Sequence, residues 1–166
     1  VTAADRPEVL KIITEECQKK QVELIRVGTD VKYEVKPLSA EGTAFNLHGL
    51  GQDLAGLVTS LIGYHQAING ATAVTAILAL EHFGIRIPLE AIREGLAQTE
   101  WAARLEVIRK KPLVLLDAAH NVDGAVTLRQ ALEEIFKYDK LVLLIGMLAD
   151  KERQKVMEIL GPLASA

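Results

Sequence analysis

The stretch LVLLDAAHNVDG, residues 113–124, decides the fold class, because it joins an apolar strand to the start of a helix through a short polar cluster. Its first four residues predict a buried strand, and DGAVTLRQALEEIFKY (123–138) predicts the helix. A second apolar run, LVLLI at 141–145, follows. Two apolar strands that flank a helix predict a right-handed βαβ crossover, since parallel strands need such a connection. We therefore expect an α/β fold.

The polar residues behind these strands are candidates for a site. In an open parallel sheet, ligands bind beyond the carboxyl ends of the strands, where Asp117, residues 118–121 and residues 146–150 are expected to lie. A purely structural explanation stays open, because Asn121 is a good helix N-cap and His120 could be a half-buried imidazole. Asp117 stands too far before the helix to serve as its cap.

The sequence outside this stretch predicts further elements of both kinds. Polar-apolar alternation predicts two half-exposed antiparallel strands at 31–37 and 43–48, which we expect to decorate the fold and not to form its core. A helix over 65–83 is rich in Ala and Gly, which would allow close approach to a sheet, and Gly84 is a natural end for it. The remaining expected elements are helices at about 5–20, 88–99 and 151–160, and strands at 22–27 and 104–108.

Composition restricts the class of protein. The 166 residues are 49% hydrophobic, which is enough for a sizeable core, and their net charge of −3 gives no basic footprint for nucleic acid. The only cysteine, Cys17, cannot form a disulfide within the chain, which favours a reducing compartment. Because we find neither a signal pattern nor a long apolar run, we expect a cytoplasmic protein with no membrane partner. Val1 at the start suits processing or a chain cut from a longer protein.

Several catalytic and ligand-binding templates do not match. The four histidines are far apart, without an HExxH or CxxC partner, so we expect no metal site made by the chain alone. No G-x-S-x-G and no G-x-x-x-x-G-K-[ST] occurs. His48-Gly-Leu-Gly51 lacks the strand-to-helix context of a phosphate-binding loop, and we interpret it as a hairpin connection.

Four ordered motifs together are more specific than any of these templates. They are GYHQAIN (63–69), WAARLE (101–106), LDAAHN (116–121) and GMLADKE (146–152). In this order and spacing they closely resemble folylpolyglutamate synthases, which in many bacteria are also dihydrofolate synthases, of the Mur ligase superfamily. The resemblance extends over nearly the whole chain.

The resemblance implies a domain organisation. Residues 1–99 would be the tail of a central P-loop-type ATPase domain, residues 100–103 a hinge, and residues 104–166 the first half of a Rossmann-like Mur ligase C-terminal domain, the glutamate ligase domain. The match begins after the family's P-loop and its metal-binding segment, so we expect a piece of a longer protein.

The resemblance also implies an activity for the parent enzyme. Such ligases use ATP and Mg²⁺ to make an acyl phosphate from folate or dihydropteroate, which the amine of L-glutamate then attacks. The metal ligands would lie in the missing N-terminal part, the parent would be a monomer, and this chain alone would be inactive. Two alternatives stay open: another Mur-type amide ligase, or a non-catalytic nucleotide-binding module.

Roles for individual residues follow only where the motifs match. By resemblance, Asn69 would bind the adenine ring, Arg104 the ATP phosphates, and Asp117 the ribose hydroxyls. His120 and Lys151 would act near the incoming glutamate or the phosphates. The residues themselves allow a structural explanation for Asn69, as an interhelical hydrogen bond, and for Arg104, as a salt bridge with Glu106 or a neighbour.

The chain departs from the family pattern at a few positions. Ala102-Ala103 stands where the family usually has Pro-Gly, Ala118 where it has Gly, and Glu152 where it commonly has Asp. Losing Pro-Gly removes a stiff turn and a residue suited to positive φ, which bears on the angle at the hinge.

Overall fold

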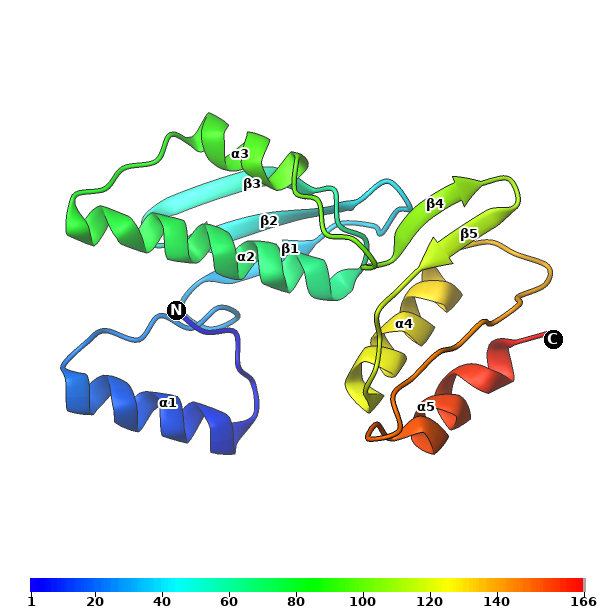
Figure 1. The fold of residues 1–166 in the computed structure, drawn as a ribbon. Helices are drawn as coiled ribbons and strands as arrows, with labels where there is room; N and C mark the ends of the chain where they lie inside the picture. Colours follow the sequence, from blue (N-terminus) through cyan, green and yellow to red (C-terminus); the bar gives the residue numbers. More distant parts are fainter. Residues whose placement is uncertain (166) are drawn as a thin grey trace.

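Within residues 1–165 the fold contains two small antiparallel β-sheets, and each sheet has at least one α-helix packed against it (Figure 1). A computed structural model describes residues 1–165. Its elements are α1 (Pro7–Lys20), β1 (Lys32–Val35), β2 (Thr43–Gly49), β3 (Gln52–Thr59), α2 (Tyr64–Ala79), the 3-10 turn η1 (Leu80–Phe83), α3 (Leu89–Ala97), β4 (Glu106–Lys110), β5 (Leu113–Leu116), α4 (Val122–Glu134), α5 (Arg153–Leu160) and the 3-10 turn η2 (Gly161–Leu163).

The first sheet, in the order β1-β2-β3, carries the largest core of the chain. Phe45 and Leu47 on β2 and Leu57 on β3 are fully buried, and Phe45 is paired with Leu57 in the register. Our expectation that these strands only decorate the fold was therefore wrong. The alternating pattern correctly predicted one buried face and one polar face, but α2 covers the apolar face and so makes it the core (Figure 1).

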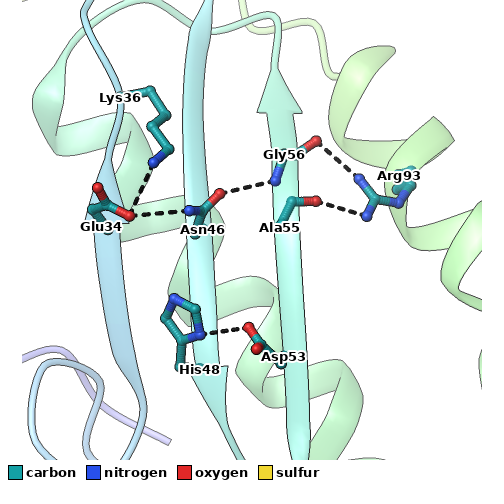
Figure 2. A network of polar contacts seen from close by, with 8 residues as sticks. All are labelled: Glu34, Lys36, Asn46, His48, Asp53, Ala55, Gly56 and Arg93. Carbon is teal, nitrogen blue, oxygen red and sulfur yellow. Dashed lines mark hydrogen bonds and ion pairs between the residues drawn. The ribbon is translucent and has the colours of Figure 1, made fainter.

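The opposite face of this sheet is polar, as Figure 2 shows. The Asn46 side chain donates to Glu34 at 3.0 Å and accepts from the Gly56 amide at 2.9 Å, which links all three strands. Arg93 on α3 donates to the backbone oxygens of Ala55 and Gly56, both at 2.8 Å. These bonds attach α3 to the edge of β3.

The small residues of α2 allow the helix to approach the sheet closely, as predicted. A Cβ atom added to Gly70 would lie 2.8 Å from Cζ of Phe45. The expected helix over 65–83 is confirmed in outline, because α2 runs from Tyr64 to Ala79 and continues as the 3-10 turn η1. Gly84 ends that turn at φ +76°, a backbone conformation that glycine adopts without strain. The hairpin expected around His48–Gly51 is also confirmed as the turn between β2 and β3.

The second sheet differs from our expectation. β4 and β5 pair antiparallel, and the apolar run 141–145 forms no strand, so the predicted parallel pairing with residues 113–116 is absent from the described residues. Leu144 is 99% exposed. The hydrophobic pattern reports only the propensity of a segment, whereas a strand also requires a hydrogen-bonded neighbour. The run 22–27 likewise makes only isolated bridges.

Packing extends across the expected hinge. Ile62, which precedes α2, is buried in one cluster with Leu105, and Ala131, Leu132 and Phe136 from α4 and its end complete that cluster. The domain boundaries at 99 and 104 stay a prediction. Among residues 1–165, no helix has both the length and the apolar character needed to cross a membrane.

Candidate functional site

The segment before α2 is fixed by a buried threonine. The hydroxyl of Thr43 donates to the Leu61 carbonyl at 2.8 Å and accepts from the Gly63 amide at 3.0 Å. Gly63 has φ +116°, and a Cβ there would lie 2.8 Å from Cε1 of His65. Glycine at position 63 therefore allows the His65 ring to lie against the backbone at the N-terminus of α2.

A cavity of about 320 Å³ lies at this end of α2. Its lining residues come from the α2 end and from the segment before β4: Leu61, His65, Gln66, Asn69, Trp101 and Arg104. Asn69 and Arg104, which are far apart in the sequence, thus share one cavity. Its volume lies at the lower end of the range typical of small-molecule pockets.

Asn69 is held by its own helix. Its Nδ2 donates to Oε1 of Gln66 at 3.0 Å, so its partner lies one turn back on α2 and not on another helix. An amide can donate two hydrogen bonds and accept two. Asn69 therefore retains one N–H and its carbonyl oxygen for a ligand in the cavity.

Arg104 is exposed beside the cavity. Among residues 1–165 its guanidinium makes no hydrogen bond or ion pair, and Glu106 instead accepts from the Ala103 amide at 2.8 Å. The salt bridge with Glu106 is therefore not formed. A planar, permanently charged fork in this position is suited to an anion such as a phosphate.

Asp117 holds the join between the two parts of the chain. Its carboxylate accepts from the Leu105 amide at 2.9 Å and from the Ala119 amide at 2.8 Å. Asp117 is not among the residues that line the cavity. Its charge still acts there: burial of the ring is the main reason that the pKa of His65 is lowered, with Arg104 adding to the effect and Asp117 opposing it.

The structure does not bring His120 or Lys151 to the cavity. The exposed His120 ring lies 2.9 Å from the Ala118 carbonyl oxygen through Nδ1, and Lys151 pairs with Asp150 at 3.0 Å. Asn121 caps α4, because its side chain accepts from the Gly124 amide at 2.7 Å. The polar cluster after β5 therefore combines capping at Asn121 with support of the join at Asp117.

His65 and Gln66 were not among the residues predicted from the sequence to form the site. Gln66 is 5% exposed, and its Nε2 lies 3.0 Å from Nε2 of His65. The signal that could have found them is their spacing from Asn69, since polar residues at i, i+1 and i+4 share the first turns of a helix.

The join itself adopts an unusual backbone. Ala103 has φ +57° and Leu105 φ +49°, a region that residues with a Cβ rarely occupy. The Ala103 carbonyl accepts from the Ala118 amide at 2.8 Å, so residue 103 keeps the positive φ even without glycine. The departure from Pro-Gly is thus accommodated at the cost of backbone strain.

Replacing Ala103 by Gly is expected to stabilise the chain. The substitution removes the left-handed strain, which costs about 1–2 kcal/mol for a residue with a Cβ, and adds chain entropy to the unfolded state, so a net gain of about 0.5–1 kcal/mol is expected. Urea unfolding measures the change. Ala102→Gly is the matched control, because Ala102 does not have a positive φ. Equal effects of the two substitutions would argue against strain at residue 103.

The described residues provide no ready metal site. No group of three or more His, Cys, Asp or Glu side chains within residues 1–165 could hold a metal ion.

Comparison with known proteins identifies relatives of this chain and supports its fold. Residues 103–166 match the family described as Mur ligase, glutamate ligase domain. The chain is 31% identical to a dihydrofolate synthase/folylpolyglutamate synthase of Bacillus subtilis, over 100% of this chain and 39% of that protein. It is 30% identical to a protein of the same name from Mycobacterium tuberculosis, over 94% of this chain and 32% of that protein.

Solved structures give the same result. A crystal structure of Mycobacterium tuberculosis folylpolyglutamate synthase complexed with ADP and AMPPCP superposes with a TM-score of 0.88 and 28% identity, over 99% of this chain and 37% of that one. A structure described as an FPGS-AMPPCP-folate complex superposes with a TM-score of 0.86 at 28% identity, over 97% of this chain and 39% of that one.

These findings indicate the class of protein, since residues 103–166 match the glutamate ligase domain of Mur ligases. Over nearly its whole length the chain is similar to folylpolyglutamate and dihydrofolate synthases. It spans less than two fifths of the length of the first two of these relatives.

Proposed function

We propose that this chain supplies part of the nucleotide site of an ATP-dependent ligase that joins L-glutamate to folate or dihydropteroate through an acyl phosphate. The observation that carries the proposal is the shared cavity, to which Asn69 contributes from α2 and Arg104 from the segment before β4. Relatives named dihydrofolate synthase/folylpolyglutamate synthase match the chain over nearly its whole length. A crystal structure of a Mycobacterium tuberculosis folylpolyglutamate synthase contains ADP and AMPPCP.

In this proposal, three residues each bind a different part of the nucleotide. The free N–H and carbonyl oxygen of Asn69 match the N7 acceptor and N6 donor that adenine presents side by side. Arg104 binds the phosphates, where its charge would offset the negative charge that develops during phosphoryl transfer. Asp117 has lone pairs left on both carboxylate oxygens and could accept from the ribose hydroxyls.

His120 and Lys151 have a less direct part in the proposal. Both lie outside the cavity, and Lys151 is paired with Asp150. A role near the glutamate or the phosphates requires a rearrangement that frees the Lys151 ammonium group. They remain proposed catalytic residues on the strength of the resemblance alone.

Titrating the ¹⁵N-labelled chain with ATP tests the nucleotide site. We expect weak, saturable shifts at the side-chain amide of Asn69 and the Nε–H of Arg104. A few hydrogen bonds of about 1–3 kcal/mol each largely cancel against an association cost of about 4–15 kcal/mol, so the Kd should be about 1 mM or weaker. Asn69→Ala should weaken binding, whereas Asn46→Ala, on the polar sheet face, should not. Shifts confined to other residues would contradict the assignment of the site.

The purified chain of 166 residues is expected to show no ATP turnover and no glutamate ligation. The sequence contains no G-x-x-x-x-G-K-[ST] loop to hold and neutralise the phosphates. Holding and neutralising the phosphates accounts for most of the catalysis in phosphoryl transfer. A phosphate-release assay over a range of protein concentrations measures it. Turnover that rises in proportion to chain concentration and survives repurification would refute this expectation.

A further inference from the structure

Three side chains that line the cavity, those of His65, Gln66 and Asn69, are joined in a row by hydrogen bonds. Nε2 of Gln66 lies 3.0 Å from Nε2 of His65, and Oε1 of Gln66 accepts from Nδ2 of Asn69 at 3.0 Å. A carboxamide nitrogen can only donate, so His65 must accept at Nε2. A neutral imidazole that accepts at Nε2 carries its proton on Nδ1. In this arrangement Gln66 donates to His65 and accepts from Asn69, so the two hydrogen-bond directions depend on each other.

We propose that His65 and Gln66 are positioning residues whose hydrogen bonds fix which way round the Asn69 carboxamide faces the cavity. The proposal rests on the proposed nucleotide-binding function. It adds that two residues that need not touch the base determine which base is bound. We call the His65–Gln66–Asn69 chain the amide relay.

The orientation of Asn69 matters because its donor and its acceptor occupy different places. Adenine presents a donor at N6 beside an acceptor at N7, whereas guanine presents acceptors at both O6 and N7. In the observed orientation, Asn69 keeps its carbonyl oxygen and one N–H for the cavity. A reversed carboxamide would exchange the positions of donor and acceptor, and it would no longer match the adenine edge.

The relay resists such a reversal because its members depend on one another. If Asn69 turned over, its oxygen would face Oε1 of Gln66, and Gln66 would have to turn over as well. Gln66 would then present Oε1 to Nε2 of His65, which would need a proton there. Gln66 is 5% exposed, so water is poorly placed to take over the lost hydrogen bonds.

The surroundings of His65 favour the neutral ring over the charged one. Nδ1 is buried and has no hydrogen-bond partner among the described residues, and burial lowers the pKa of the ring. The charged groups that act on it are Arg104, which disfavours protonation, and Asp117, which favours it. The ring therefore stays neutral at pH 7 and above.

The ring nitrogens of His65 report whether the relay operates. Asn69→Asp places an acceptor-only group at the far end, so Gln66 must donate toward Asp and turn Oε1 toward His65, which then carries a proton on Nε2. Long-range ¹H–¹⁵N spectra at pH 8 should show Nδ1–H in the wild-type chain and a protonated Nε2 in Asn69→Asp. His65→Ala identifies the signals by their loss.

A second variant protects this test against misfolding of the first. Gln66→Glu still accepts from Asn69 but cannot donate to His65, so it too should place a proton on Nε2. Asn46→Asp, on the polar sheet face, is the matched control and should leave His65 unchanged. An unaltered His65 tautomer in a folded Asn69→Asp or Gln66→Glu chain overturns the relay, as does an Nε2–H tautomer in the wild type.

Nucleotide titration tests the consequence for base selection. Gln66→Leu keeps a similar volume and cuts both links, so the preference for ATP over GTP should fall by about tenfold. An unchanged preference overturns the positioning role. A wild-type chain that binds neither nucleotide contradicts the proposed function instead, and the His65 tautomer in Asn69→Asp then decides the relay by itself.

Discussion

Replacing Phe45 by Ala is expected to lower the free energy of unfolding by about 3–5 kcal/mol, the usual cost of removing a buried aromatic ring and leaving a cavity. Phe45 is fully buried between the first sheet and α2. A domain of ordinary stability has about 5–15 kcal/mol in total, so a large part of it would be lost. Urea unfolding monitored by circular dichroism measures the change. Val58→Ala, at a β3 side chain that is 45% exposed, should cost far less.

A double-mutant cycle separates burial of the Phe45 ring from its fit against the helix. Gly70→Ala alone should destabilise by about 1–3 kcal/mol, because the new Cβ would lie 2.8 Å from Cζ of Phe45. Within Phe45→Leu, where that ring is absent, Gly70→Ala should instead be neutral or stabilising, since Ala is the better helix former by about 1 kcal/mol. Additive effects of the two substitutions would contradict the close approach of α2 to the sheet.

The contact between Gly70 and Phe45 also shows how far sequence predicts this fold. The small residues of α2 and the alternation along β2 are local patterns, and both correctly indicated their elements. Which face of the sheet becomes core depends on where α2 lies, and no local pattern encodes this. The run 141–145 also shows that local patterns are not sufficient. Its composition favours a strand, but among the described residues it has no strand to pair with.

The candidate site, too, was predicted only in part from the sequence. Asn69, Arg104 and Asp117 were selected because their motifs resemble those of a family, and the cavity brings the first two together. Their hydrogen-bond partners were not selected. Asp117 supports the join through the Leu105 amide, and Gln66 holds Asn69 through its side chain. The first contact depends on tertiary geometry, whereas the second lies within α2 at a spacing that the sequence already gives.

Arg104→Ala is expected to lower kcat for glutamate ligation by about 100-fold or more in a full-length enzyme that contains these residues. The reason is that a guanidinium aimed at the transferring phosphoryl group gains interaction as charge develops, and removing one such donor typically costs about 10²–10³ in rate. The KM for ATP should rise less than kcat falls if the interaction is made mainly in the transition state. Steady-state kinetics with saturating glutamate measures both.

The free guanidinium separates a catalytic role of Arg104 from a structural one, because within residues 1–165 the side chain makes no polar contact that would stabilise the fold. The Arg104 side chain is exposed and makes no hydrogen bond or ion pair within residues 1–165, so Arg104→Ala should change the free energy of unfolding by no more than about 0.5 kcal/mol. Arg104→Lys keeps the charge but loses the fork, and it should fall between wild type and Ala. Arg109→Ala, at an exposed arginine on β4, is the matched control and should leave kcat unchanged. A loss of stability with unchanged kcat in Arg104→Ala would return the residue to a structural role, whereas a fall in kcat without a loss of stability places its charge at the reacting phosphate.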